Sequence, residues 1–204
     1  MGFKDILPTL DATLLKVSSL EIPKDRKLLL EPLIEYLRNK KEDKIQLNFI
    51  CTHNSRRSQF GQVWGQVAAY YYGYDVECFS GGTEETTFHP NAIAALSRQG
   101  FAISSGGEEN PRYTIMYSNK GILECYSKVY DSEANPSKDF AAIMTCSHAD
   151  ESCPIIQGAD VKVSLKYEDP KKFDGTELEG EMYDERSLQI ASEMFYVFES
   201  ASKG

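Results

Sequence analysis

Five residues separate Cys51 from Arg57 in the stretch IQLNFICTHNSRRSQF, residues 45–60. The apolar residues before Cys51 favour a strand, and an amphipathic pattern begins after Arg57, so the chain between them should turn from a strand into a helix. The backbone N–H groups of such a turn point into one concavity, and the helix dipole adds positive potential there. The turn therefore suits a tetrahedral oxyanion.

The side chains of this turn suit nucleophilic chemistry on the bound oxyanion. Arg57 offers a planar fork of donors, and Cys51, at the base of the same positive field, should attack as a thiolate. Ser58 can donate its hydroxyl to that thiolate or cap the helix. The alternative is structural, with Cys51 as a buried residue at a strand end and the two arginines as a solvated helix start.

The segment CTHNSRRSQF resembles the phosphate-binding loop of the low-molecular-weight tyrosine phosphatase superfamily. It is most similar to the thioredoxin-coupled arsenate reductase branch, whose loop usually reads CTGNSCRSQ. His53 replaces the usual glycine and Arg56 the usual cysteine; histidine tolerates unusual backbone angles, so we expect the loop still to form. The resemblance implies an oxyanion site built from Thr52, His53, Asn54, Ser55, Arg56, Arg57 and Ser58.

The resemblance extends beyond the loop. The strings SGGTE, HPNAIAAL and GFAIS are similar to the second segment of the same family. The similar part of the chain runs from about residue 45 to 200 and omits residues 106–139. The family implies a central four-stranded parallel sheet flanked by helices.

A second pair of cysteines, Cys146 and Cys153, lies in CSHADESC, directly after the apolar run FAAIMT. That run is typical of a buried parallel strand, which would end at the same sheet edge as the first strand, so Cys146 can approach Cys51. This placement favours a redox relay. Two unrelated cysteines remain an alternative, and a metal site of Cys146, His148 and Cys153 would lack a fourth ligand.

The resemblance implies how such a relay would run. Cys51 attacks arsenate, and Cys146 attacks the thiol–arsenate adduct and releases arsenite. Cys153 then attacks the Cys51–Cys146 disulfide and leaves Cys146 joined to Cys153 in a mobile loop, where thioredoxin can reach it.

The dipeptide Asp169-Pro170 supplies a candidate general acid. The departing oxygen of arsenate or of a phosphoester must be protonated, and the family places an Asp-Pro after its last strand for this task. Asp169 is therefore the expected acid, and Glu168 is its local competitor.

Composition limits the class of protein. A chain of 204 residues with 41% hydrophobic residues suits one globular domain with an appendage. It contains no run of membrane-span length and no signal-peptide pattern, so we expect a soluble, cytoplasmic protein without a membrane partner. The net charge of −9 argues against binding to nucleic acid. The five cysteines favour thiol chemistry over a framework of structural disulfides. We expect no cofactor and no metal.

The order of the elements predicts an α/β fold with a central parallel sheet flanked by helices. Residues 1–44 should form an N-terminal helical extension, residues 45–204 the phosphatase-like domain, and residues 106–139 an inserted β-hairpin. Cys78 and Cys125 are interpreted as core residues. The expected helices cover 5–18, 24–41, 58–72, 90–100 and 183–200, and the expected strands cover 45–50, 75–79 and 140–145.

Two activities remain open on these residues. The first is reduction of arsenate by Cys51, Cys146 and Cys153 with thioredoxin as reductant. The second is hydrolysis of phosphomonoesters by Cys51, Arg57 and Asp169 through a phosphocysteine, which does not need the distal cysteines. A non-catalytic module that only binds an oxyanion is a third interpretation.

Overall fold

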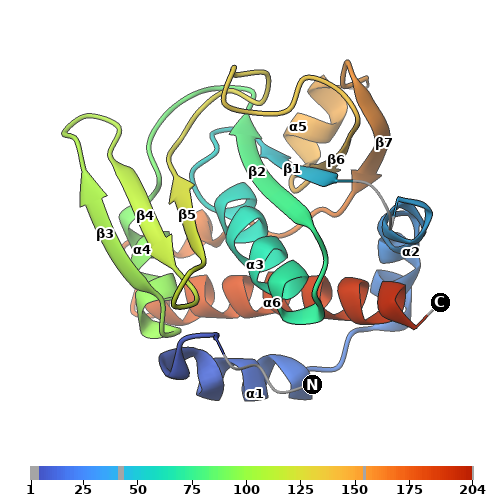
Figure 1. Cartoon of the computed structure of the whole chain (residues 1–204). Helices are drawn as coiled ribbons and strands as arrows, with labels where there is room; N and C mark the ends of the chain where they lie inside the picture. The colour runs from blue at the N-terminus through green and yellow to red at the C-terminus, as the bar shows by residue number, and fades with distance from the viewer. Residues whose placement is uncertain (1–4, 41–43, 154, 204) are drawn as a thin grey trace.

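A computed structural model of the protein describes residues 5–40, 44–153 and 155–203. Its centre is a four-stranded parallel sheet in the order β2-β1-β6-β7 (Figure 1). The sheet confirms the predicted fold class. Its strands are β1 (Ile45–Cys51), β2 (Val76–Gly82), β6 (Phe140–Met144) and β7 (Ala159–Ser164).

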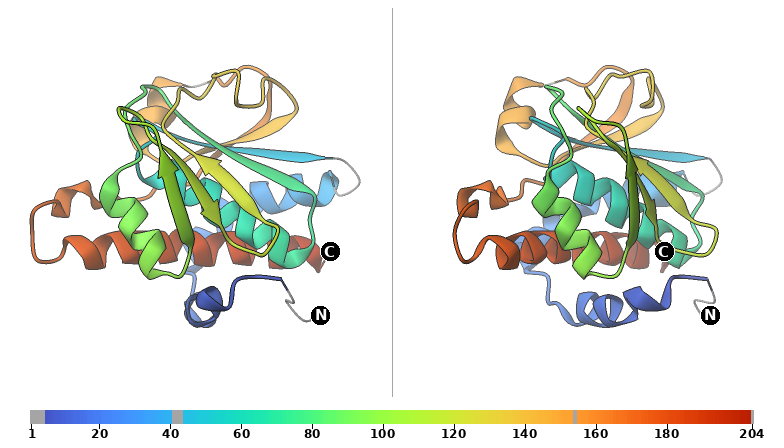
Figure 2. Two further views of the ribbon diagram at one scale, coloured as in Figure 1. Left: turned by 60° about the vertical axis from the view of Figure 1, so that its left-hand side comes forward. Right: turned by 90° about the vertical axis from the view of Figure 1, so that its left-hand side faces the viewer.

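Helices cover both faces of this sheet. Helices α3 and α6 pack in successive layers on one face, and the short helix α5 lies on the other (Figure 1). The N-terminal helix α1 lies beneath α6, on the side away from the sheet (Figure 2). The helices are α1 (Asp11–Ser19), α2 (Lys24–Asn39), α3 (Arg57–Tyr72), α4 (Pro90–Arg98), α5 (Ser147–Ser152) and α6 (Glu179–Ser202), with 3-10 turns at Pro8–Leu10 and Pro170–Phe173.

The expected hairpin is present but belongs to a larger unit. Strands β4 (Arg112–Met116) and β5 (Ile122–Cys125) pair antiparallel on either side of the turn SNKG. Strand β3 (Ala102–Gly106) pairs with β4 and extends the hairpin to three strands beside the main sheet (Figure 1).

Several predicted boundaries differ from the observed ones. The first helix begins at Asp11 rather than residue 5, because Pro8 starts a 3-10 turn instead. The second helix ends at Asn39, and Lys41 lies outside the described residues. Strand β2 continues to Gly82, beyond the predicted end at residue 79, because residues 80–82 still pair with β1.

The hydrophobic core lies between the sheet and the helices α3 and α6. Trp64 of α3 is fully buried and donates its indole N–H to Ser187 of α6 at 2.8 Å. Cys78 and Cys125 are buried in this core, as expected. Among the described residues, none of the helices has the length and apolar character needed to cross a membrane.

The N-terminal extension is tied to the core by a buried ion pair. Arg26 of α2 donates to both carboxylate oxygens of Glu193 in α6, at 2.9 and 2.6 Å. Tyr167 also donates to Glu193, at 2.8 Å, and the Arg26 guanidinium lies 4.9 Å from the centre of its ring. The extension thereby fixes the residue that lies two positions before Asp169.

Helix α3 lies so close to β1 that Gly61 has no space for a side chain. A Cβ atom at Gly61 would lie 2.4 Å from the Phe49 ring. We expect Gly61→Ala to lower the free energy of unfolding by about 1–3 kcal/mol, the usual cost of overpacking, in urea denaturation.

Gly106→Ala is the matched control, because nothing lies within 4 Å of a Cβ atom built there. Its effect should stay within about 0.5 kcal/mol. Equal losses in the two variants would contradict the close packing of α3 on β1.

Candidate functional site

The loop from Cys51 to Arg56 connects the carboxyl end of β1 to the start of α3. The Cys51 sulfur is buried inside this loop, 3.1 Å from the Ser58 hydroxyl oxygen and 3.2 Å from the backbone nitrogen of Asn54. Asn54 Nδ2 donates to Ser58 Oγ at 2.8 Å, so the Ser58 hydroxyl hydrogen is left to donate to sulfur. Ser58 therefore faces Cys51 and does not cap α3, whose N-cap is Arg56.

The carbonyl groups of the loop are bound on its outer side. The carbonyls of Cys51 and Thr52 accept the backbone N–H groups of Thr83 and Glu84, at 3.1 and 2.9 Å. The Ser55 carbonyl likewise accepts the N–H of His89 at 3.0 Å. A peptide N–H points opposite to its carbonyl, so these bonds turn the N–H groups of the loop toward the Cys51 sulfur. This arrangement is an anion cradle.

The segment after β5 braces the same loop. Lys128 donates its backbone N–H to Asn54 Oδ1 at 3.0 Å, and the Ser127 hydroxyl donates to the His53 carbonyl at 3.0 Å. Asn54 has φ 46, so the left-handed position of the loop falls on Asn54 and not on His53. The inserted residues 106–139 thus support the loop, a role that the sequence did not indicate.

Arg57 and Asp169 meet at the rim of the cradle. Arg57 donates from Nη2 to Asp169 at 2.5 Å and from Nη1 to the Tyr167 carbonyl at 3.0 Å. Its Nε is buried and has no hydrogen-bond partner among the described residues, so one donor of the fork is left for an oxyanion. Glu168 is exposed and pairs with Lys172 instead.

Arg56 connects the loop to the segment that follows Asp169. It donates from Nε to the Tyr183 hydroxyl at 2.6 Å and from Nη2 to Asp174 at 3.3 Å. Burial raises the pKa of Tyr183 to about 12, so the phenol stays protonated and donates to Asp174 at 2.8 Å. Burial and the nearby Arg56 charge lower the pKa of His89, which caps α4 and stacks on Tyr183. Arg56 thus ties the start of α3 to the segment after Asp169, and its side chain points toward Tyr183 and Asp174.

The distal cysteines share an apolar cluster with Cys51. Cys51 and Cys146 lie at the carboxyl ends of the neighbouring strands β1 and β6 and are buried members of this cluster, and Cys153 packs against it. Cys146 is 2% exposed and lies 3.4 Å from the Thr52 hydroxyl, and Cys153 is half-buried. The segment between the two cysteines forms helix α5, so the expectation of a loop is wrong here.

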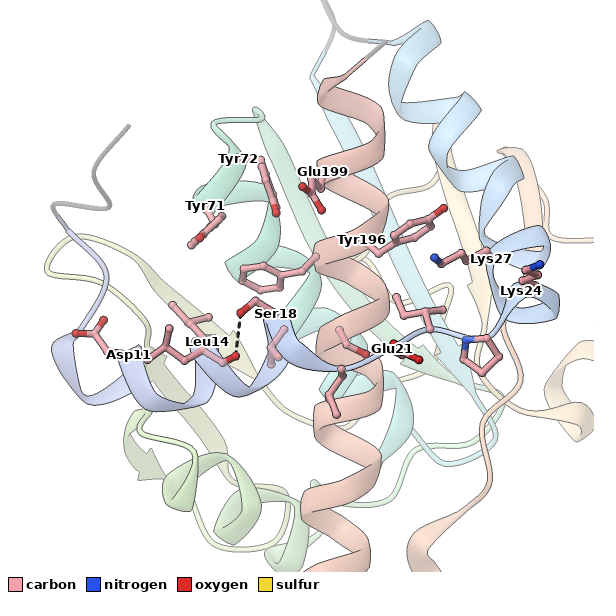
Figure 3. A pocket seen from close by; sticks show the side chains of 17 residues that line it. Asp11, Leu14, Ser18, Glu21, Lys24, Lys27, Tyr71, Tyr72, Tyr196 and Glu199 are labelled. Atoms are coloured by element: carbon pink, nitrogen blue, oxygen red, sulfur yellow. Dashed lines mark hydrogen bonds between the residues drawn. The ribbon is translucent and has the colours of Figure 1, made fainter.

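A cavity of about 1170 Å³ lies elsewhere, between α1, the start of α2 and α6 (Figure 3). Tyr71, Tyr72 and Tyr196 line it together with leucines of α1. None of the residues expected to perform chemistry lines this cavity, so its size does not mark the site.

The comparisons with known proteins agree with this geometry. No protein-family model matches the chain. An arsenate reductase of Halalkalibacterium halodurans is 30% identical over 131 residues, which cover 64% of this chain and 78% of the relative. Arsenate reductase 1 of Staphylococcus saprophyticus is 30% identical over 148 residues, which cover 72% of this chain and 95% of the relative.

Solved structures support the fold independently. A low-molecular-weight tyrosine phosphatase from T. tengcongensis superposes with a TM-score of 0.52 at 17% identity, over 76% of this chain and 98% of that one. An arsenate reductase in its oxidised state superposes with a TM-score of 0.51 at 19% identity, with the same coverage. The chain therefore belongs to the arsenate reductase family, and its fold is that of the low-molecular-weight tyrosine phosphatases.

Proposed function

We propose that this protein is an enzyme that reduces arsenate to arsenite through a relay of Cys51, Cys146 and Cys153, with thioredoxin as the final reductant. The observation that carries the proposal is that Cys51 and Cys146, at the carboxyl ends of the neighbouring strands β1 and β6, share one apolar cluster against which Cys153 packs. In this proposal residues 45–204 are the catalytic domain, and residues 1–44 are a supporting extension.

The first step uses the anion cradle. Arsenate binds to the loop N–H groups and to Arg57, and the Cys51 thiolate, stabilised by Ser58 and the Asn54 N–H, attacks arsenic. Asp169, held at the rim by Arg57, protonates the departing oxygen, which leaves as water. The product is a covalent adduct of arsenate on Cys51.

In the second step the Cys146 thiolate attacks the Cys51 sulfur. The sulfur–arsenic bond breaks and its electron pair stays on arsenic, so arsenic is reduced to arsenite while the two cysteines are oxidised to a disulfide. Cys51 and Cys146 follow the paired residues Ile50 and Met144 on neighbouring parallel strands. Both cysteines are therefore held at the same edge of the sheet.

The third step requires helix α5 to unwind. A helix between Cys146 and Cys153 holds their Cα atoms about 10 Å apart at 1.5 Å per residue. A disulfide needs a Cα separation below about 7 Å. Cys153 can therefore attack the first disulfide only when the six residues of α5 unwind. Unwinding also exposes the new Cys146–Cys153 disulfide to thioredoxin.

Hydrolysis of phosphomonoesters is the second candidate activity. A phosphocysteine on Cys51 would need the same groups as a thiol–arsenate adduct, namely the anion cradle, Arg57 and Asp169. The burial of Cys146 against the loop favours the reductase, because a phosphatase has no use for a second thiol at that position.

The relay is tested by arsenate-dependent NADPH oxidation with thioredoxin and thioredoxin reductase. Turnover by the parent protein should be lost in Cys153→Ser, because the first disulfide cannot be resolved. Hydrolysis of p-nitrophenyl phosphate, measured beside it, separates the two activities. Phosphatase turnover in both proteins without arsenate turnover would establish the hydrolase instead.

The acid is tested by Asp169→Asn. Asparagine keeps the shape but cannot deliver a proton, so turnover should fall by about 10²–10⁴ while phosphate, measured as a competitive inhibitor, binds nearly as before. Glu168→Gln is the control, because Glu168 is exposed and faces Lys172. An equal loss in Glu168→Gln, or a parallel loss of phosphate affinity in Asp169→Asn, would remove the acid role from Asp169.

A further inference from the structure

The hydroxyl of Thr52 lies between two side chains of the segment that carries the distal cysteines. Thr52 Oγ1 is 3.4 Å from the Cys146 sulfur and 3.4 Å from Nδ1 of His148. Thr52 follows Cys51 directly in the loop, and His148 is an exposed residue at the start of α5. The three steps proposed above leave His148 without a role, and they leave the proton of the Cys146 thiol without an acceptor.

The order of these atoms suits transfer of a proton. A threonine hydroxyl can accept one hydrogen bond and donate another at the same time, and a neutral imidazole accepts on the nitrogen that carries no hydrogen. The Cys146 S–H can therefore point at Thr52 Oγ1 while the Thr52 O–H points at His148 Nδ1. Passing one proton along this chain turns the Cys146 thiol into a thiolate and His148 into an imidazolium.

We propose that His148 is the base for Cys146 and acts through the hydroxyl of Thr52. The inference rests on the proposed reductase function and assigns the proton of its second step. As the Cys146 thiolate forms its bond to the Cys51 sulfur, His148 holds the proton that Cys146 has lost. The imidazolium then returns this proton to an oxygen of the departing arsenite, so no other acid or base is required.

The charged groups on α5 and in the loop are engaged with partners other than His148. Asp150, on the same helix, pairs with Lys162 and Lys166 at 2.8 and 3.0 Å. In the loop, the His53 ring lies 3.6 Å from Glu84. Arg57, at the rim, pairs with Asp169. The Cys146 sulfur also accepts the backbone N–H of Ala149 at 3.4 Å, but this group cannot take a proton, so the Thr52 hydroxyl is the contact that can pass one on.

The inference is tested by titrating Cys146 in a Cys51→Ser/Cys153→Ser protein through the ultraviolet absorbance of its thiolate. Burial raises the pKa of Cys78, and it raises the pKa of Cys125 to about 12, so these two thiols stay silent over the range measured. Adding His148→Gln should move the midpoint of the Cys146 titration upward by about one pH unit. At a pH below the midpoint this is a tenfold loss of thiolate. Thr52→Val should cause the same shift.

The two changes should not add, because they interrupt one path, and Thr52→Ser should restore the original midpoint. Ser147→Ala, an exposed neighbour on α5, is the matched control and should leave the midpoint in place. In Cys153→Ser protein, which stops after one turnover, His148→Gln should slow arsenite release about tenfold.

The titration separates this inference from the proposed function. A midpoint that does not move in His148→Gln, or moves equally in Ser147→Ala, overturns the proton path whatever the turnover. A midpoint that moves as expected in a protein that releases no arsenite supports the path and rejects the reductase.

Discussion

The site depends on one constraint, which is that four carbonyl groups of the Cys51 loop are hydrogen-bonded by residues outside the unit of β1, loop and α3. Residues after β2 bind the carbonyls of Cys51, Thr52 and Ser55, and residues after β5 bind that of His53. Each such bond turns a peptide N–H to the inner side of the loop, so in the proposed function the loop is arranged for an anion before any anion arrives. An isolated strand–loop–helix unit would lack these partners.

The second feature of the site is its double arginine clamp. Arg57 holds Asp169 and the Tyr167 carbonyl, and Arg56 holds Asp174. Both arginines leave the loop at the start of α3, so the segment around the candidate acid is fixed to the anion cradle at two points. Arg56 replaces the family's usual cysteine, and its side chain donates to Tyr183 instead of pointing to Cys51. The replacement is therefore interpreted as structural.

Much of this architecture could be predicted from local sequence. The apolar run FAAIMT and the periodicity of α3 and α6 specify buried elements, and the spacing of Cys51 and Arg57 specifies the loop. The contacts of Arg56 could not be predicted, because its partners lie 118 and 127 residues away in the chain. Helix α5 was missed because it has only six residues and begins after Cys146, which is not among the preferred N-cap residues.

In the proposed relay one molecule of arsenate takes two electrons from the thiols, and the resulting disulfide passes from Cys51–Cys146 to Cys146–Cys153. The most direct test is mass spectrometry of disulfide-linked peptides after one equivalent of arsenate. The parent protein should contain a Cys146–Cys153 disulfide, and Cys153→Ser should instead contain a Cys51–Cys146 disulfide. Cys51 and Cys146 remaining as free thiols in both proteins, with arsenate unchanged, would contradict the relay.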